Sequence, residues 1–286
     1  MPRLLRSCLI ALAGAAALAA GCGRASPEPE VQRAEVSRMG NPRIVPVVAS
    51  RIDDDPAVGA LVREMRAEAD AFVFLSGGAS KMSSESERAL LDLFDGLTML
   101  TAEGLRLGVG DGGTQAGIMQ AAGNARAKSK APFPLLGISP AREIPPGGTT
   151  PIDPNHSAII AVDNPDWDGT NGYFGSETAA MYKVFARLAD GKPSVAVVAN
   201  GGGITLTEID ENISAGRPIV LVSGSGRAAD VLVSLLANQT ADSVEAELRQ
   251  KAEALNLRRR PDLFHTFNLT DGPREFARML RSLIER

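Results

Sequence analysis

The chain has 286 residues, of which 44% are hydrophobic and 22% are charged, a composition typical of a globular domain and too apolar for a disordered chain. Its formal charge of −4 and its aromatic content of 4% disfavour a nucleic-acid binder, which needs a basic surface and stacking platforms. Both cysteines, Cys8 and Cys22, lie near the start, and there are two histidines, so we expect neither a disulfide in the body nor a Cys or His metal site.

The N-terminal segment has the parts of an export signal. Arg3 and Arg6 supply positive charge, and the apolar run Cys8–Ala20 that follows is too short to span a bilayer as a helix. The run ends in Leu18-Ala19-Ala20-Gly21-Cys22, which resembles the bacterial lipobox, where the cysteine carries a diacylglycerol after cleavage. Two alternatives stay open: an ordinary signal peptide cut after Ala19, and a start codon assigned too far upstream.

On the lipobox interpretation, residues 1–21 are a lipoprotein signal peptide and Cys22 is the lipidation site. Residues 22–42 then form a flexible tether, because they contain several prolines and charges but no dense apolar pattern. Gly23 stands where an aspartate would retain a Gram-negative lipoprotein in the inner membrane. We therefore expect a protein of the cell envelope, anchored by lipid to the outer membrane and facing the periplasm if the host is Gram-negative.

From residue 43 onward, short apolar runs alternate with helical patterns. Continuous apolar runs such as Phe72–Leu75 are typical of strands buried on both faces of a parallel sheet, and Pro46 in the first run predicts an edge strand or an entry segment. The predicted strands are 44–48, 72–75, 105–109, 135–138, 158–162, 195–199, 219–222 and 263–269. The predicted helices are 61–69, 84–101, 114–127, 176–189, 205–215, 227–236, 242–255 and a terminal helix from residue 271. This alternation predicts an α/β fold, with a doubly wound, mostly parallel sheet and helices on both faces, in one domain over residues 43–286.

Four of the predicted strands end in glycine-rich turns that lead into helices. In a parallel sheet these turns share the carboxyl edge, where ligands bind, and the N–H groups of a helix N-terminus attract anions. The residues concerned are Gly77, Gly78, Gly112, Gly113, Thr114, Gly201, Gly202, Gly203, Gly224, Ser225, Gly226 and Arg227. Glycine also serves tight turns where nothing binds, but four such turns on one edge, one of them with an arginine, favour a phosphate site.

Six stretches of the body match the motifs of one family in the same order. They are Phe74–Ala79, Asp111–Met119, Asp153–Ser157, Phe174–Thr178, Val195–Gly203 and Pro218–Asp230. These stretches resemble the LSDAT branch of the SLOG superfamily, whose Rossmann-like domains include the lonely-guy phosphoribohydrolases and the N-terminal domain of melastatin-type TRP channels. The resemblance covers residues 43–285 and implies a ligand derived from a nucleotide, such as ADP-ribose or an NAD-like molecule. It also implies ligand-facing roles for His156 and Glu177, against plainer roles in ordering a loop and capping a helix.

The stretch Asn200–Glu208 occupies the frame P-G-G-x-G-T-x-x-E of the lonely-guy enzymes, with Glu208 at the place of their carboxylate. A hydrolase of an N-glycosidic bond would use Glu208 as its catalytic residue. The related enzymes also carry an arginine in an R-K-x-x-M helix, and the corresponding stretch Glu177–Met181 has none, so a major electrostatic contribution is missing. Binding without turnover is therefore favoured, with the hydrolase and a non-catalytic envelope scaffold as alternatives.

The expected partners follow from these features. They are a small nucleotide-derived ligand and the membrane, reached through the lipid on Cys22. We expect no nucleic acid, no metal and no cofactor, and a homo-oligomer is compatible with the sequence.

Lipidation of Cys22 has a direct test. Cys22→Ala removes the thiol that would carry the lipid, so we expect the protein to move from the membrane fraction to the soluble fraction of host cells. Cys8→Ala is the matched control, because Cys8 would be discarded with the signal peptide. Fractionation and immunoblotting measure both, and an unchanged distribution of Cys22→Ala would contradict the anchor.

Overall fold

The computed structural model describes residues 40–78, 82–169, 172–239, 246–255, 257 and 260–286. All of these belong to one unit, Val36–Arg286, by their internal contacts. The predicted signal peptide, Cys22 and all but the last three residues of the predicted tether lie outside the described residues. Among the helices described, none has the length and hydropathy needed to cross a membrane.

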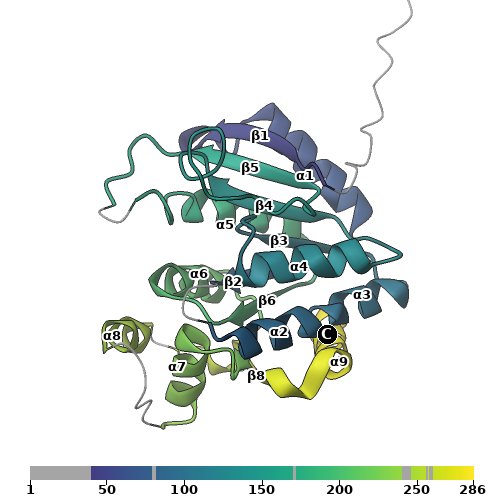
Figure 1. Cartoon of the computed structure of the whole chain (residues 1–286), viewed down its shortest axis with the longest axis vertical. Helices are drawn as coiled ribbons and strands as arrows, with labels where there is room; N and C mark the ends of the chain where they lie inside the picture. Colours follow the sequence, from purple (N-terminus) through teal and green to yellow (C-terminus); the bar gives the residue numbers. More distant parts are fainter. Residues whose placement is uncertain (1–39, 79–81, 170–171, 240–245, 256, 258–259) are drawn as a thin grey trace, which may run out of the picture. The chain divides into compact units, whose positions relative to one another are not determined.

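In the described part of the chain, eight parallel strands form one sheet in the order β1-β5-β4-β3-β2-β6-β7-β8 (Figure 1). The strands are β1 Arg43–Val48, β2 Ala71–Gly77, β3 Leu107–Asp111, β4 Leu135–Pro140, β5 Ala158–Asp163, β6 Ser194–Ala199, β7 Ile219–Ser223 and β8 Phe264–Asn268. This arrangement confirms the predicted α/β fold. β1 is an edge strand, as Pro46 predicts, because proline cannot donate a hydrogen bond to a second neighbour.

Helices cover both faces of the sheet. They are α1 Pro56–Glu68, α2 Ser84–Leu93, α3 Asp95–Ala102, α4 Gly117–Lys128, α5 Thr178–Ala189, α6 Gly203–Ser214, α7 Arg227–Leu236, α8 Ala246–Ala254 and α9 Gly272–Ile284. Alternate residues of β2 show the division: Val73 packs in the core beneath α2, α3, α4 and α9, whereas Phe72 and Phe74 pack beneath α1 and α5. α6, α7 and α8 cover the second face over β6 and β7. Burial on both faces explains why the strands have continuous apolar runs.

The predicted helix 84–101 is in fact two helices, α2 and α3, which meet at Phe94. Phe94 is fully buried and packs edge-on against Phe276 of α9, with ring centroids 5.8 Å apart. Gly96 follows, where a Cβ would lie 2.6 Å from the carbonyl oxygen of Pro273. The bend therefore lets α3 approach α9 closely, a tertiary contact that the hydrophobic periodicity of residues 84–101 does not reveal.

The strand order reverses between β2 and β6, which is the topological switch point of the sheet. From β2 the chain proceeds to β3 and β4 on one side, and later to β6, β7 and β8 on the other. Connections at such a point leave opposite ways and open a crevice at the carboxyl ends of the strands, where ligands of doubly wound folds bind. The crevice here lies at the ends of β3, β2 and β6.

Candidate functional site

A cavity of about 560 Å³ lies at this point of the carboxyl edge, a volume suited to a small-molecule ligand. The turns after β2, β3 and β6 form its walls, together with the start of α5 and Arg227 of α7. The residues proposed from the sequence that line it are Gly77, Gly78, Gly112, Thr114, Glu177, Gly202, Gly203, Glu208 and Arg227. Residues of three separate turns are thus brought together around one space.

The remaining proposed residues do not line the cavity. They are Gly113, His156, Gly201, Gly224, Ser225 and Gly226. In the turn after β7, the Asp230 carboxylate accepts hydrogen bonds from the Gly224 and Gly226 N–H groups, at 2.7 and 3.0 Å. Ser225 is buried, and its hydroxyl donates to the Val222 carbonyl oxygen and accepts from the Asn200 N–H, at 2.6 and 2.8 Å. Ser225 thus holds the turn after β6 in place through Asn200. The Gly224 and Gly226 N–H groups are already hydrogen-bonded to Asp230.

The turn after β6 brings the N-terminus of α6 to the cavity. Gly201 has φ +94°, and a Cβ there would lie 2.6 Å from Thr205 Oγ1, so only glycine fits. Gly202 N–H donates to the same Thr205 oxygen at 3.2 Å. The first-turn N–H groups of α6, beginning at Gly203, thus lie at the cavity wall, where the helix dipole favours an anion.

Arg227 lies beside this helix start. It has φ +45°, a left-handed conformation that costs a non-glycine residue roughly 1 kcal/mol. A Cβ on Gly202 would lie 3.3 Å from Arg227 Nη1 and Nη2, so the guanidinium group packs directly on the Gly202 backbone. A strained backbone that places a cation at a helix N-terminus is an arrangement suited to binding phosphate.

A buried ion cluster supports the wall formed by the turn after β3. His156 Nε2 lies 2.8 Å from Asp111 Oδ1, and His156 Nδ1 lies 3.2 Å from Asp153 Oδ1. Burial alone would lower the pKa of His156, but the two carboxylates outweigh it and raise the pKa to about 9. His156 is therefore an imidazolium at neutral pH, and it joins the end of β3 to the loop that contains Asp153.

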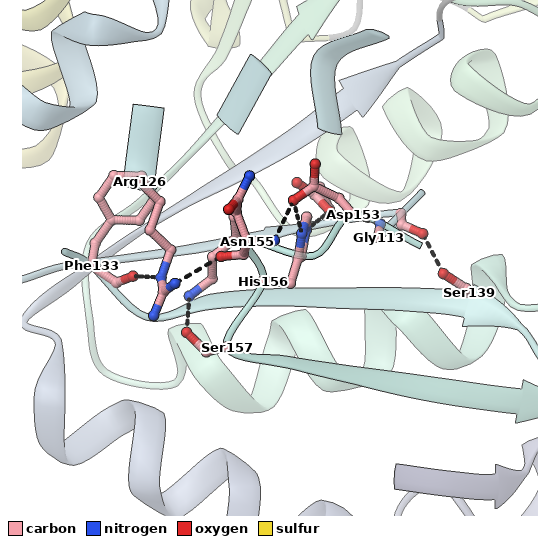
Figure 2. A network of polar contacts seen from close by, with 11 residues as sticks. Gly113, Arg126, Phe133, Ser139, Asp153, Asn155, His156 and Ser157 are labelled. Carbon is pink, nitrogen blue, oxygen red and sulfur yellow. Dashed lines mark hydrogen bonds and ion pairs between the residues drawn. The ribbon is translucent and has the colours of Figure 1, made fainter. Parts of the chain in front are cut away.

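Backbone hydrogen bonds extend this cluster in both directions. Asp111 Oδ1 also accepts from Gly113 N–H at 2.7 Å, and Asp153 Oδ1 accepts from Asn155 N–H at 2.9 Å. Figure 2 shows how Arg126 of α4 fixes the far end of the loop, where it donates to the carbonyl oxygens of Phe133 and Asn155 at 2.9 and 2.8 Å. The positions of Gly112 and Thr114 at the cavity are thus set by charges that lie behind them.

Two carboxyl groups line the cavity, those of Glu177 and Glu208. Burial raises the pKa of Glu177 to about 7, although its own backbone and Gly175 N–H, which donates to Oε2 at 2.8 Å, act in the opposite direction. Burial raises the pKa of Glu208 to about 8, and the nearby Glu177 and Asp111 add to the shift while a hydrogen bond from Ser76 opposes it. Near neutral pH the cavity is thus less negative than its two glutamates suggest.

A second hollow adjoins the cavity. This groove has a volume of about 670 Å³ and shares Phe174, Gly203 and Ile204 with the cavity. Trp167 and Lys251 also line it. Phe174 and Ile204 are among the few large apolar side chains exposed in the described residues, at 39% and 40%. The two hollows together give room for a ligand longer than a mononucleotide.

Sequence reasoning missed four buried polar residues behind Glu208. They are Ser76 of β2, Tyr182 of α5, Asn212 of α6 and Arg217, which precedes β7. No motif marks them, although an arginine next to a buried strand is itself unusual. Within the described residues, no group of three or more His, Cys, Asp or Glu side chains is arranged to hold a metal ion.

The two glutamates make a prediction about stability and pH. Their folded pKa values lie above the ordinary value of 4.5, so between pH 4.5 and about 8 the folded state holds more protons than the unfolded state and stability falls as pH rises. We expect the double variant Glu177→Gln/Glu208→Gln to lose less stability than the wild type between about pH 5 and 8. Urea unfolding at several pH values measures this.

His156 and a control variant bear on the difference between the wild type and the double variant. The stabilisation by His156, whose pKa is also raised, is lost from about pH 6.5 to 9 in both proteins alike. Glu85→Gln/Glu87→Gln, at two exposed positions of α2, is the matched control and should follow the wild type. Parallel curves for the wild type and the cavity variant would contradict the prediction.

Comparison with known proteins places the chain in a family. The family model described as "SLOG in TRPM, prokaryote" (LSDAT_prok) matches residues 70–276, more than half of the chain. Transient receptor potential cation channel subfamily M member 2 of Rattus norvegicus is 33% identical over 131 residues, which are 42% of this chain and 8% of the relative. Member 7 of the same subfamily from Homo sapiens is 31% identical over 143 residues, which are 46% of this chain and 7% of the relative. These matches thus span less than a tenth of the length of either relative, but the family match shows that the chain belongs to the prokaryotic SLOG domains of the LSDAT type.

Proposed function

We propose that this SLOG domain binds, and so senses, a nucleotide-derived phosphate ligand such as ADP-ribose or an NAD-like molecule. The observation that carries the proposal is the position of Arg227, a strained residue whose guanidinium group packs on Gly202 next to the N-terminus of α6. A fixed cation and a helix start at one cavity favour a phosphate group, and the family resemblance implies a ligand of nucleotide origin.

The size and charge of the site support this choice. The cavity of about 560 Å³ opens beside a groove of about 670 Å³, so an extended ligand has room for a second half beyond its phosphates. The protein as a whole is acidic, and two glutamates line the cavity, yet their raised pKa values reduce the repulsion of an anion near neutral pH. Attraction is therefore local, from Arg227 and the start of α6.

The place of action is part of the same proposal. The export signal and the lipid on Cys22 would hold the domain at the cell envelope, where the tether would keep its cavity off the membrane surface. A ligand reaching the site would then come from outside the cytoplasm.

Isothermal titration calorimetry with ADP-ribose, NAD, AMP and cyclic AMP tests the binding function. We expect at least one of them to bind with a Kd below about 1 mM. Arg227→Ala should weaken that binding by about 10-fold or more, because a charge-assisted hydrogen bond to phosphate is lost.

Arg278→Ala is the matched control, since it removes the same charge from an exposed position on α9. It should leave the affinity unchanged. Absence of binding by all four compounds, or an Arg227→Ala variant that binds as well as the wild type, would refute the proposal.

One observation favours a second candidate function, hydrolysis of an N-glycosidic bond. Glu208 lines the cavity, and its pKa is raised to about 8, so it is protonated at neutral pH. As a general acid it could donate this proton to the leaving base. Release of ribose 5-phosphate from AMP, and its loss in Glu208→Gln, is the expected result. A wild-type protein that releases no sugar phosphate from any of the four compounds would leave binding as the function.

A further inference from the structure

Three hollows of the molecule share Gly203, the first residue of α6. The cavity and the groove both reach it, and so does a smaller hollow of about 190 Å³. Arg227 of α7 lines the cavity and the small hollow, whereas Lys251 of α8 lines the small hollow and the groove. Two cations from different helices therefore lie beside the start of α6, where the cavity adjoins the groove.

Both cations lie close to the backbone at the helix start. A Cβ on Gly203 would lie 3.8 Å from Lys251 Nζ, and a Cβ on Gly202 would lie 3.3 Å from Arg227 Nη1 and Nη2. Their charges add to the partial positive charge of the helix N-terminus. The small hollow is below the roughly 300–1,000 Å³ of pockets that hold a whole ligand, so it suits a single phosphate group.

Glu247 is the acidic residue that lines the small hollow. Its Oε1 lies 2.7 Å from Lys251 Nζ, and the two side chains are 78% and 56% exposed. Water screens an exposed ion pair of this kind, so it opposes the approach of a phosphate only weakly. An ammonium group has three protons, and the contact with Glu247 leaves donors for a second acceptor. The pair therefore orients Lys251 and leaves it able to bind an anion.

Thr178 gives an independent indication that the groove holds a ligand. It begins α5, lines the groove and is only 5% exposed. Its Oγ1 atom is buried and has no hydrogen-bond partner among the described residues. Because buried hydroxyl groups are nearly always hydrogen-bonded, this atom points to a partner that enters through the groove.

The remaining walls of the groove suit an uncharged part of a ligand. Phe174 and Ile204 expose apolar surface there, and the indole of Trp167 is held in place because Nε1 donates to the Gly172 carbonyl oxygen at 2.9 Å. The volume of about 670 Å³ admits a nucleoside or a sugar. A ligand that extends from the cavity into the groove past Gly203 would carry its linker between the two cations.

We propose that Lys251 is a second phosphate-binding residue and that the site takes diphosphates. One phosphate group binds Arg227 and the next binds Lys251, while the two ends of the ligand occupy the cavity and the groove. The inference rests on the proposed function and narrows its ligand to nucleoside diphosphates and their conjugates. Monophosphates and cyclic monophosphates, which engage one cation, are discriminated against by charge.

Calorimetry with AMP and ADP, which differ by one phosphate group, tests the role of Lys251. The wild type should bind ADP about 5-fold or more tightly than AMP. Lys251→Ala should weaken the binding of ADP and of ADP-ribose by about 5-fold to 10-fold and that of AMP by less than about 2-fold, whereas Arg227→Ala should weaken all three. No loss in Lys251→Ala, or equal losses for AMP and ADP, would overturn the inference.

Lys183→Ala is the matched control. Lys183 is also a helical lysine in an ion pair, with Asp53 at 2.9 Å, its side chain is 55% exposed, and it lines none of the three hollows. This variant should bind ADP as the wild type does. Lys251→Arg keeps the charge and should keep most of the ADP affinity, which separates loss of the charge from damage to α8.

Fluorescence shows whether the ligand reaches the groove. Trp167 is the only tryptophan of the chain and lines the groove, so its emission reports on this place alone. ADP-ribose should change that emission with the same Kd that calorimetry gives. Unchanged emission in a protein that calorimetry shows to bind ADP-ribose would contradict a ligand that extends into the groove.

Inorganic pyrophosphate separates the two-cation site from the nucleotide function. The wild type should bind it more tightly than inorganic phosphate, and Lys251→Ala should lose that preference. If pyrophosphate behaves in this way and no nucleotide binds, the proposed function fails and the assignment of Lys251 stands. If nucleotides bind and Lys251→Ala matches the wild type, the assignment fails and the proposed function stands. A wild type that binds neither pyrophosphate nor any nucleotide refutes both.

Discussion

The ion cluster of His156 with Asp111 and Asp153 is the interaction on which the cavity depends. All three side chains are buried, with exposures of 0% to 1%, and each carboxylate also accepts a backbone N–H. Removing one member of such a cluster leaves a buried charge without compensation, which typically costs about 3–5 kcal/mol. The β3 turn and the loop that contains Asp153 are therefore joined firmly, and the neighbouring bridge between Thr114 and Ile152 continues that contact. Gly123 of α4 accommodates the cluster, because a Cβ there would lie 2.2 Å from Asp153 Oδ1.

Buried carboxyl groups occur both behind the β3 turn and inside the cavity, but among the described contacts only those behind the turn have a cationic partner. Behind the β3 turn, the carboxylates of Asp111 and Asp153 are each paired with His156. Inside the cavity, Glu177 and Glu208 are raised in pKa by burial and have no such cation bound to them in the described contacts. The outcome is a site whose fixed charges lie behind its walls or at Arg227, while its glutamates change their charge close to neutral pH.

Much of this architecture follows from local patterns. Strands buried on both faces have continuous apolar runs, and glycines end those strands, so the sheet and its carboxyl edge are predictable from the sequence. The role of each single glycine cannot be predicted from the sequence, because Gly203 and Gly224 both stand in glycine-rich turns after a strand. Only the fold shows that the Gly224 N–H is already bonded to Asp230 while Gly203 begins a helix at the cavity. The break at Phe94 depends in the same way on a distant partner, α9.

The four buried polar residues behind Glu208 show this limit most clearly. Ser76 and Tyr182 are separated by 106 residues, and Tyr182 and Asn212 by 30, and each one alone resembles an ordinary residue of a strand or a helix. The fold connects them, because Arg217 is hydrogen-bonded to Asn212, Asn212 to Tyr182 and Tyr182 to Ser76. Such contacts depend on side-chain geometry across elements, which no spacing rule contains.

The most direct measurement of the central claim is a crystal structure of the protein with ADP-ribose. The account predicts phosphate oxygens in contact with the Arg227 guanidinium group and the first-turn N–H groups of α6. A ligand bound elsewhere on the domain, with this cavity occupied by water alone, would contradict it.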